Sequence, residues 1–131
     1  MDLSGFKAFD FSAGWPYFSV TKNGMTFSKA VTVKLGYPEF TRFLINQETK
    51  QVALQVCNKD DSNAASFYRA RKSNIYSVRW NTHDLIATME RLLGESLENA
   101  GYRVDGELID ERTMLFDLNK AKKLDSAGFT A

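Results

Sequence analysis

One stretch of the chain interleaves cations with aromatic rings, and this pattern could bind a polyanion. Residues 67–80 read FYRARKSNIYSVRW. A guanidinium group neutralises phosphate while a neighbouring ring covers a base or a sugar, so the pattern is typical of nucleic-acid contacts. The alternation of Tyr76, Val78 and Trp80 also fits a strand that turns these side chains toward a core.

Further cations could extend a positive surface if the fold brings them together. The predicted nucleic-acid-binding residues are Lys22, Lys29, Lys34, Arg42, Arg69, Arg71 and Lys72. The alternative is a module without a nucleic-acid role, in which an aromatic-lined cleft accepts a small molecule or a protein. Its candidate ligand-binding residues are Trp15, Tyr68 and Trp80.

Residues suited to catalysis are few. His83, the only histidine, stands beside Asp84 at the expected start of a helix, where it could be a general base or a surface residue. Cys57, the only cysteine, ends an apolar strand and is expected to pack as a small hydrophobe. No glycine-rich phosphate loop or metal-ligand cluster is present. We therefore expect a protein that is not an enzyme and that needs no cofactor or metal, and carboxylate chemistry is the remaining enzymatic alternative.

Length and composition indicate one globular domain with a core of its own. The chain has 131 residues, of which 44% are hydrophobic and 25% charged. No apolar run approaches the roughly 20 residues of a membrane-spanning helix, and no basic region opens the chain. A single cysteine permits no internal disulfide. These features predict a cytoplasmic protein without a membrane partner.

The charge is uneven along the chain. Residues 21–80 carry ten Lys and Arg against four Asp and Glu, whereas residues 81–131 carry six against ten. Such asymmetry can mark a face for a polyanion, two surfaces that attract each other in a dimer, or only scattered solvated charges.

Hydrophobic periodicity and turn residues predict the elements that would position these side chains. Strand-like residues 17–21 and 25–27 flank an Asn-Gly turn, and a short helix is expected over 29–35. Residues 40–45 and 51–57 form the clearest hairpin. Residues 75–80 are expected to form a strand. The apolar stripe after residue 83 predicts a helix that Gly94 can end, and residues 102–109 and 114–118 are expected to form a hairpin.

The order strand, helix, hairpin therefore occurs twice. We expect an α+β fold of two βαββ-like halves, forming an antiparallel or mixed sheet with the helices on one face. Within the single domain 1–131, an N-terminal arm (1–16) precedes the first half (17–57). A polar connection (58–74), the second half (75–118) and a frayed C-terminus (119–131) follow. The halves could be a duplication, or similar by chance.

Residues 17–56 resemble the swapped-hairpin domain of AbrB-type transcription regulators and MazE-type antitoxins. The matching run is Gly24-Met25-Thr26-Phe27-Ser28, then a short helix ending in Leu35-Gly36, then a β-hairpin. Met25 and Ser28 stand where the family usually has arginine and proline. The resemblance implies an interlocked homodimer that binds double-stranded DNA, with Lys22, Lys29 and Lys34 facing the DNA. The leading hypothesis is thus a dimeric regulator or antitoxin-like protein whose basic first half binds DNA and whose acidic second half could hold a protein partner.

Overall fold

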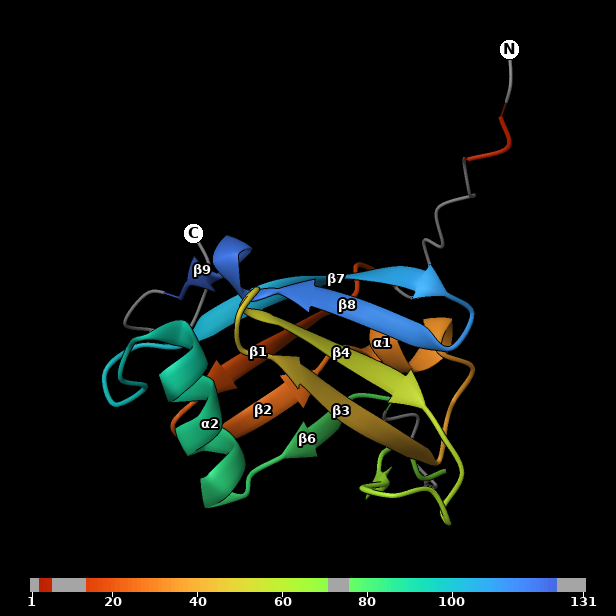
Figure 1. Cartoon of the computed structure of the whole chain (residues 1–131), viewed down its shortest axis with the longest axis horizontal. Coiled ribbons are helices and arrows are strands. Elements are labelled where there is room, and N and C mark those ends of the chain that lie inside the picture. The colour runs from red at the N-terminus through yellow and green to blue at the C-terminus, as the bar shows by residue number, and fades with distance from the viewer. Residues whose placement is uncertain (1–2, 6–13, 71–75, 125–131) are drawn as a thin grey trace.

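A computed structural model describes residues 3–5, 14–70 and 76–124 of the chain. In the described residues, nine strands form one curled antiparallel sheet, a half-barrel, which two α-helices accompany (Figure 1). The strands are β1 (Tyr17–Thr21), β2 (Gly24–Phe27), β3 (Phe40–Asn46), β4 (Gln51–Val56), β5 (Ala65–Ser66), β6 (Val78–Trp80), β7 (Tyr102–Asp110), β8 (Thr113–Asp117) and β9 (Lys122–Lys123). The helices are α1 (Lys29–Lys34), α2 (His83–Leu93) and the short 3-10 helix η1 (Leu118–Lys120).

The expected α+β class with both helices on one sheet face is wrong. Strand dominates the described chain, and α1 has only six residues. Strands β2 and β6 pair antiparallel, and each leads directly into a helix. The two helices therefore leave at opposite ends of the strands, where α2 and α1 lie in Figure 1, and they do not form a helical layer on the sheet.

The hairpins predicted from turn residues are confirmed. The turn Lys22-Asn23 joins β1 to β2, with Gly24 as the first residue of β2 and not part of the turn. Residues 40–46 pair with 51–56, and β7 pairs with β8. Thr82 is the N-cap of helix α2, and the helix ends at Gly94, whose φ of 69° is left-handed. Two short strands were not predicted: β5 lies in the supposed polar connection, and β9 follows η1 in the supposed frayed C-terminus.

The sheet order places two edge strands opposite each other. The order is β5-β3-β4-β8-β7-β1-β2-β6, with β9 added beside β7. The curl of the sheet brings its first strand, β5, near its last, β6. A hydrogen bond from the Trp80 side chain in β6 to the backbone carbonyl of Ser66 in β5 shows this proximity. No ladder pairs these two strands in the described residues, so a seam remains between them.

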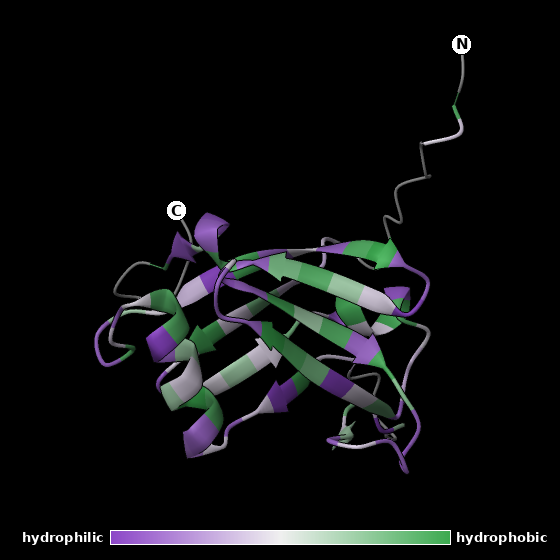
Figure 2. Cartoon of the chain, viewed as in Figure 1, coloured by the Kyte–Doolittle hydropathy of each residue, from purple (hydrophilic) through white to green (hydrophobic). Residues whose placement is uncertain are grey.

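Hydrophobic residues recur along the strands of the sheet (Figure 2), and a dense apolar core fills the inside of the curled sheet. Alternate residues of the strands point inward, and Phe18, Phe27 and Phe116 are fully buried. Their rings contact one another at centroid distances of 4.9–6.1 Å. Helix α2 adds Met89 and Leu92 to this core, so the helices close the ends of a β core and do not form a separate layer.

Candidate functional site

The seam between β5 and β6 is the part of the fold where the predicted basic and aromatic residues meet. After β5 the chain runs beside the segment that precedes β3, where the backbone N–H groups of Phe67 and Tyr68 donate to the carbonyls of Glu39 and Pro38. On the other side of the seam, residues 78–80 form β6, which pairs with β2. The cation-aromatic stretch thus lines both sides of the seam, with residues 71–75 outside the described part of the chain.

Trp80 closes the seam with its side chain. Its indole Nε1 donates to the carbonyl oxygen of Ser66 at 3.1 Å. Its ring contacts Phe27, Phe43 and Phe67 at centroid distances of 5.0, 5.9 and 5.9 Å. The predicted ligand-binding residue Trp80 therefore holds two sheet edges together through packing and one hydrogen bond.

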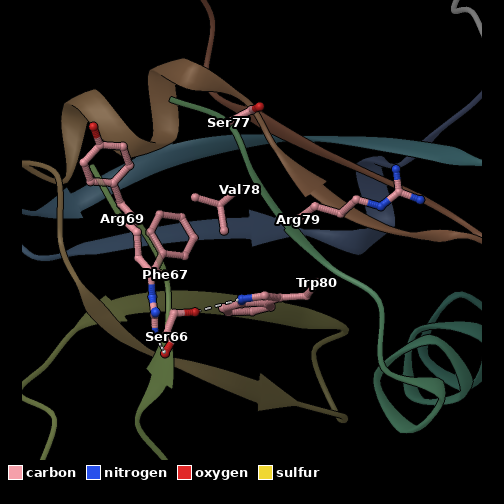
Figure 3. Close-up of a pocket in the computed structure, with 8 residues that line it drawn as sticks. Ser66, Phe67, Arg69, Ser77, Val78, Arg79 and Trp80 are labelled. Carbon is pink, nitrogen blue, oxygen red and sulfur yellow. Dashed lines mark hydrogen bonds between the residues drawn. The ribbon is translucent and has the colours of Figure 1, made fainter. Parts of the chain in front are cut away.

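A small cavity lies between the two sides of the seam (Figure 3). Its volume is about 70 Å³, and Ser66–Arg69 and Ser77–Trp80 line it. Hollows of about 370 and 390 Å³ adjoin it at Tyr68–Arg69 and at Arg79–Trp80. Among the described residues, two arginines and no acid belong to the cavity lining, while Glu39 lines the adjoining hollow together with Arg69.

Three tyrosines form a cluster beside the seam. Tyr37 lies 5.5 Å from Tyr68 and 5.8 Å from Tyr76 between ring centroids, and Tyr68 stacks on Tyr76 at 6.1 Å with 22° between the planes. Tyr37 is 46% exposed. The Thr32 hydroxyl donates to the carbonyl of Tyr76 at 2.6 Å and so ties this residue to α1. We call Tyr37, Tyr68 and Tyr76 the tyrosine cluster.

Cations accompany the tyrosine cluster and the seam. The Lys29 ammonium lies over the ring of Tyr76, 5.3 Å from its centroid. Arg69 directly follows Tyr68 and donates to the Ser66 hydroxyl at 3.3 Å. Arg79 is exposed on the outer side of β6 and donates to the carbonyl of Asn23 at 2.7 Å. In Figure 3 its guanidinium points away from the cavity.

The other predicted nucleic-acid-binding residues lie elsewhere. Lys34 lines a separate hollow of about 380 Å³ with Trp15, Pro16 and Glu107. It stands five positions after Lys29 on α1, about 140° around the helix, so the two face different directions. Arg42 donates to Gln55 across β3 and β4. Lys22 is exposed in the β1–β2 turn. Arg71 and Lys72 fall outside the described residues.

The predicted ligand-binding residues also lie in two separate places. Tyr68 and Trp80 both line the cavity of the seam, whereas Trp15 lies in the hollow that Lys34 also lines. The candidate binding residues predicted from the sequence included neither Tyr37 nor Tyr76. Tyr76 belonged to the cation-aromatic stretch, and that signal could have found it. Tyr37 follows a helix end, with φ of 58°, and no sequence signal brings it to residues 68 and 76.

The groups considered for catalysis occupy ordinary structural positions. His83 is exposed at the first position of α2. Among the carboxylates, which the sequence left as the enzymatic alternative, Asp61 and Asp110 accept backbone N–H groups within their own turns. Burial raises the pKa of the Cys57 thiol, and nearby Asp61 raises it further against two arginines. Among the described residues, no three His, Cys, Asp or Glu side chains are close enough to hold a metal.

No protein-family model, curated protein or solved structure matches the chain. The resemblance of residues 17–56 to the swapped-hairpin regulators therefore stays a prediction. Within the described segments, no helix has the length and apolar character to cross a bilayer.

Proposed function

We propose that this protein is not an enzyme but binds single-stranded nucleic acid at the tyrosine cluster. The observation that carries the proposal is the convergence of three tyrosine rings with Lys29 and Arg69 from separate parts of the chain. A cytoplasmic location, where nucleic acid is present and a lone cysteine stays reduced, fits this function.

The chemistry of the cluster suits an unpaired strand. Every base offers a flat face for stacking, and base–aromatic stacking contributes roughly 1–3 kcal/mol per base. Tyr37 offers an exposed ring for this contact. Lys29 lies over Tyr76, and Arg69 shares a hollow with Tyr68, so each cation would neutralise a phosphate of a strand that stacks on the cluster.

A single strand fits this surface better than the duplex that the resemblance implies. Major-groove recognition needs a projecting helix or a two-stranded ribbon. Helix α1 is six residues long and buries Ala30, Val31 and Thr32, so it does not project. Lys22, Lys34 and Arg42 also lie apart from the cluster, and they form no continuous stripe with Lys29.

A matched pair of charge variants tests the proposal. Fluorescence anisotropy would follow the binding of a labelled twelve-residue oligothymidylate to the intact chain. Lys29→Gln and Lys34→Gln remove the same charge from the same helix, but only Lys29 belongs to the cluster. We expect Lys29→Gln to weaken binding about 3- to 10-fold and to lower the salt slope by roughly 0.7, while Lys34→Gln leaves both unchanged.

Tyr37→Ala tests the stacking contribution separately from charge. This side chain is exposed, so its removal leaves the fold intact and should weaken oligothymidylate binding about tenfold. The salt slope should stay the same, because no charge is lost. Equal effects of the two lysine variants, or no effect of Tyr37→Ala, would contradict the proposed site.

A further inference from the structure

An acidic side chain lies next to the tyrosine cluster, where binding of a phosphate backbone favours positive charge. Glu39 lines the hollow of about 370 Å³ together with Phe40, Tyr68, Arg69 and Ala70. Among these described residues, its carboxylate is the one negative charge. Because a carboxylate repels phosphate, Glu39 weakens backbone contacts at this surface unless it forms a favourable contact with another part of the ligand.

Backbone hydrogen bonds hold Glu39 beside one ring of the cluster. The carbonyl of Glu39 accepts the Phe67 N–H at 2.8 Å, and the carbonyl of Pro38 accepts the Tyr68 N–H at 3.0 Å. The residue after Glu39 begins β3, which pairs with β5. The sheet therefore sets the position of Glu39 relative to Tyr68.

Among the described residues, no protein group pairs with the carboxylate of Glu39. The ion pairs in this part of the chain all involve Asp105, and the guanidinium of Arg69 in the same hollow donates to the Ser66 hydroxyl. Glu39 is exposed, so both carboxylate oxygens are available to a ligand. The hollow also has the size of a small-ligand site, which starts at roughly 300 Å³.

We propose that this hollow binds a guanine base of the single strand and that Glu39 selects guanine over the other bases. The inference rests on the proposed binding of single-stranded nucleic acid at the tyrosine cluster. The base would stack on Tyr68, and the two carboxylate oxygens of Glu39 would accept its N1–H and N2–H groups. Arg69 would keep its contact with phosphate.

Guanine is the base whose hydrogen-bonding groups match a carboxylate. Its unpaired Watson–Crick edge presents two adjacent donors, whereas the amino groups of adenine and cytosine each stand beside a ring nitrogen that accepts. Thymine and uracil place one N–H between two carbonyl oxygens. A carboxylate only accepts hydrogen bonds, so it forms two with guanine, at most one with any other base, and repels the neighbouring acceptors.

The experiment changes one base of the strand. Anisotropy titrations of the full-length chain compare labelled twelve-residue oligothymidylate with the same strand carrying a single guanine near its middle. We expect the guanine strand to bind about tenfold more tightly. Hypoxanthine at that position lacks the N2 amino group and should lose most of the gain. The base 7-deazaguanine keeps both donors and should retain it, which excludes recognition through the N7 edge.

Two acid variants supply the matched control. Glu39→Gln replaces one acceptor oxygen with a donor and should reduce the preference for guanine over thymine to less than about twofold. Glu48→Gln removes the same charge from the exposed turn between β3 and β4 and should leave the preference unchanged. The ratio of the two affinities is the readout, because a general loss of folding would weaken both strands alike.

The outcomes separate this inference from the proposed function. Equal affinity for the two strands, loss of the gain with 7-deazaguanine, or a guanine preference that persists in Glu39→Gln would overturn the role of Glu39. If Tyr37→Ala still weakens oligothymidylate binding in that case, the proposed function stands without guanine selection. Failure of both strands to bind at low salt would overturn both.

Discussion

At the scale of single residues, Trp80 links the fold to the candidate site. It packs on rings from β2, β3 and the segment behind β5, and it bonds to Ser66. The sequence indicated two roles for this tryptophan, a core residue of a strand and a ligand-binding ring. The structure places it in a third position, at the boundary between two sheet edges.

Trp80→Ala should destabilise the protein by about 3 kcal/mol, because it removes aromatic packing and leaves the Ser66 carbonyl without its donor. Urea unfolding followed by far-ultraviolet circular dichroism measures the change. Trp15→Ala is the control: Trp15 is 55% exposed, and its removal should cost less than about 1 kcal/mol. Similar losses for both variants would show that Trp80 does not hold the seam.

The raised pKa values of two weakly acidic side chains lead us to predict a loss of stability at alkaline pH. Burial raises the pKa of Cys57, and burial together with Glu95 raises the pKa of Tyr102. Both groups therefore lose their protons more readily in the unfolded chain than in the folded one. Their contribution to stability is complete below the unfolded pKa values and decreases as pH rises through the folded ones.

The measurement is the free energy of unfolding between pH 8 and about pH 10.5. The wild-type value should fall across this range. The fall should be smaller in a variant that carries both Cys57→Ser and Tyr102→Phe, since neither replacement titrates there. An equal fall in the two proteins would assign alkaline destabilisation to other groups.

At the scale of elements, local patterns predicted the hairpins and α2 but not how they combine. The Asn-Gly turn, the alternation of Val52 and Leu54, and the apolar stripe of α2 are signals carried by neighbouring residues. The antiparallel pairing of β2 with β6 depends on residues more than 50 positions apart. That pairing decides which end of the sheet each helix occupies, and no local pattern contains it.

Strand β7 shows a second long-range constraint, at Gly106. Before this residue β7 pairs with β1, and from it onward β7 pairs with β8. A side chain at Gly106 would meet Met114 Sδ and Phe116 Cε2, each at 2.7 Å. Glycine is required here because core side chains occupy the space of a Cβ atom while the strand changes partners.

Gly106→Ala should destabilise the protein by about 1–3 kcal/mol through overpacking against Met114 and Phe116. Thermal and urea unfolding would measure the loss. Gly5→Ala is the matched control, because a Cβ atom added there would meet no described atom within 4 Å, and its stability should be unchanged. A neutral Gly106→Ala would mean that the core relaxes freely around β7.

At the scale of the whole molecule, the chain's second half supplies the strands that complete the sheet of the first. Strands β2 and β4 pair with β6 and β8 of the same chain. A second copy is therefore not needed for these ladders, although the resemblance to swapped-hairpin regulators implies a homodimer. We expect a monomer, and light scattering coupled to size exclusion should give a mass near 14.8 kDa. A mass twice as large would support the interlocked dimer.

The candidate site could be predicted only in part, because tertiary contacts bring its residues together. The cation-aromatic stretch was visible in the sequence, and its described residues do line the seam. The excess of positive charge in residues 21–80 was also visible, but the curl of the sheet distributes Lys22, Lys34 and Arg42 over separate surfaces. Tyr37 joins the cluster only through tertiary contacts.

The most direct test of nucleic-acid binding at the tyrosine cluster compares a single strand with the duplex of the same nucleotide sequence. Anisotropy titrations would measure the affinity of the wild-type chain for a twelve-residue single strand and for the matching duplex at several salt concentrations. We expect the single strand to bind at least tenfold more tightly, with a slope of log K against log salt near −1.4 for two phosphate contacts. Equal affinity for duplex and single strand, or no binding of either at low salt, would contradict the account.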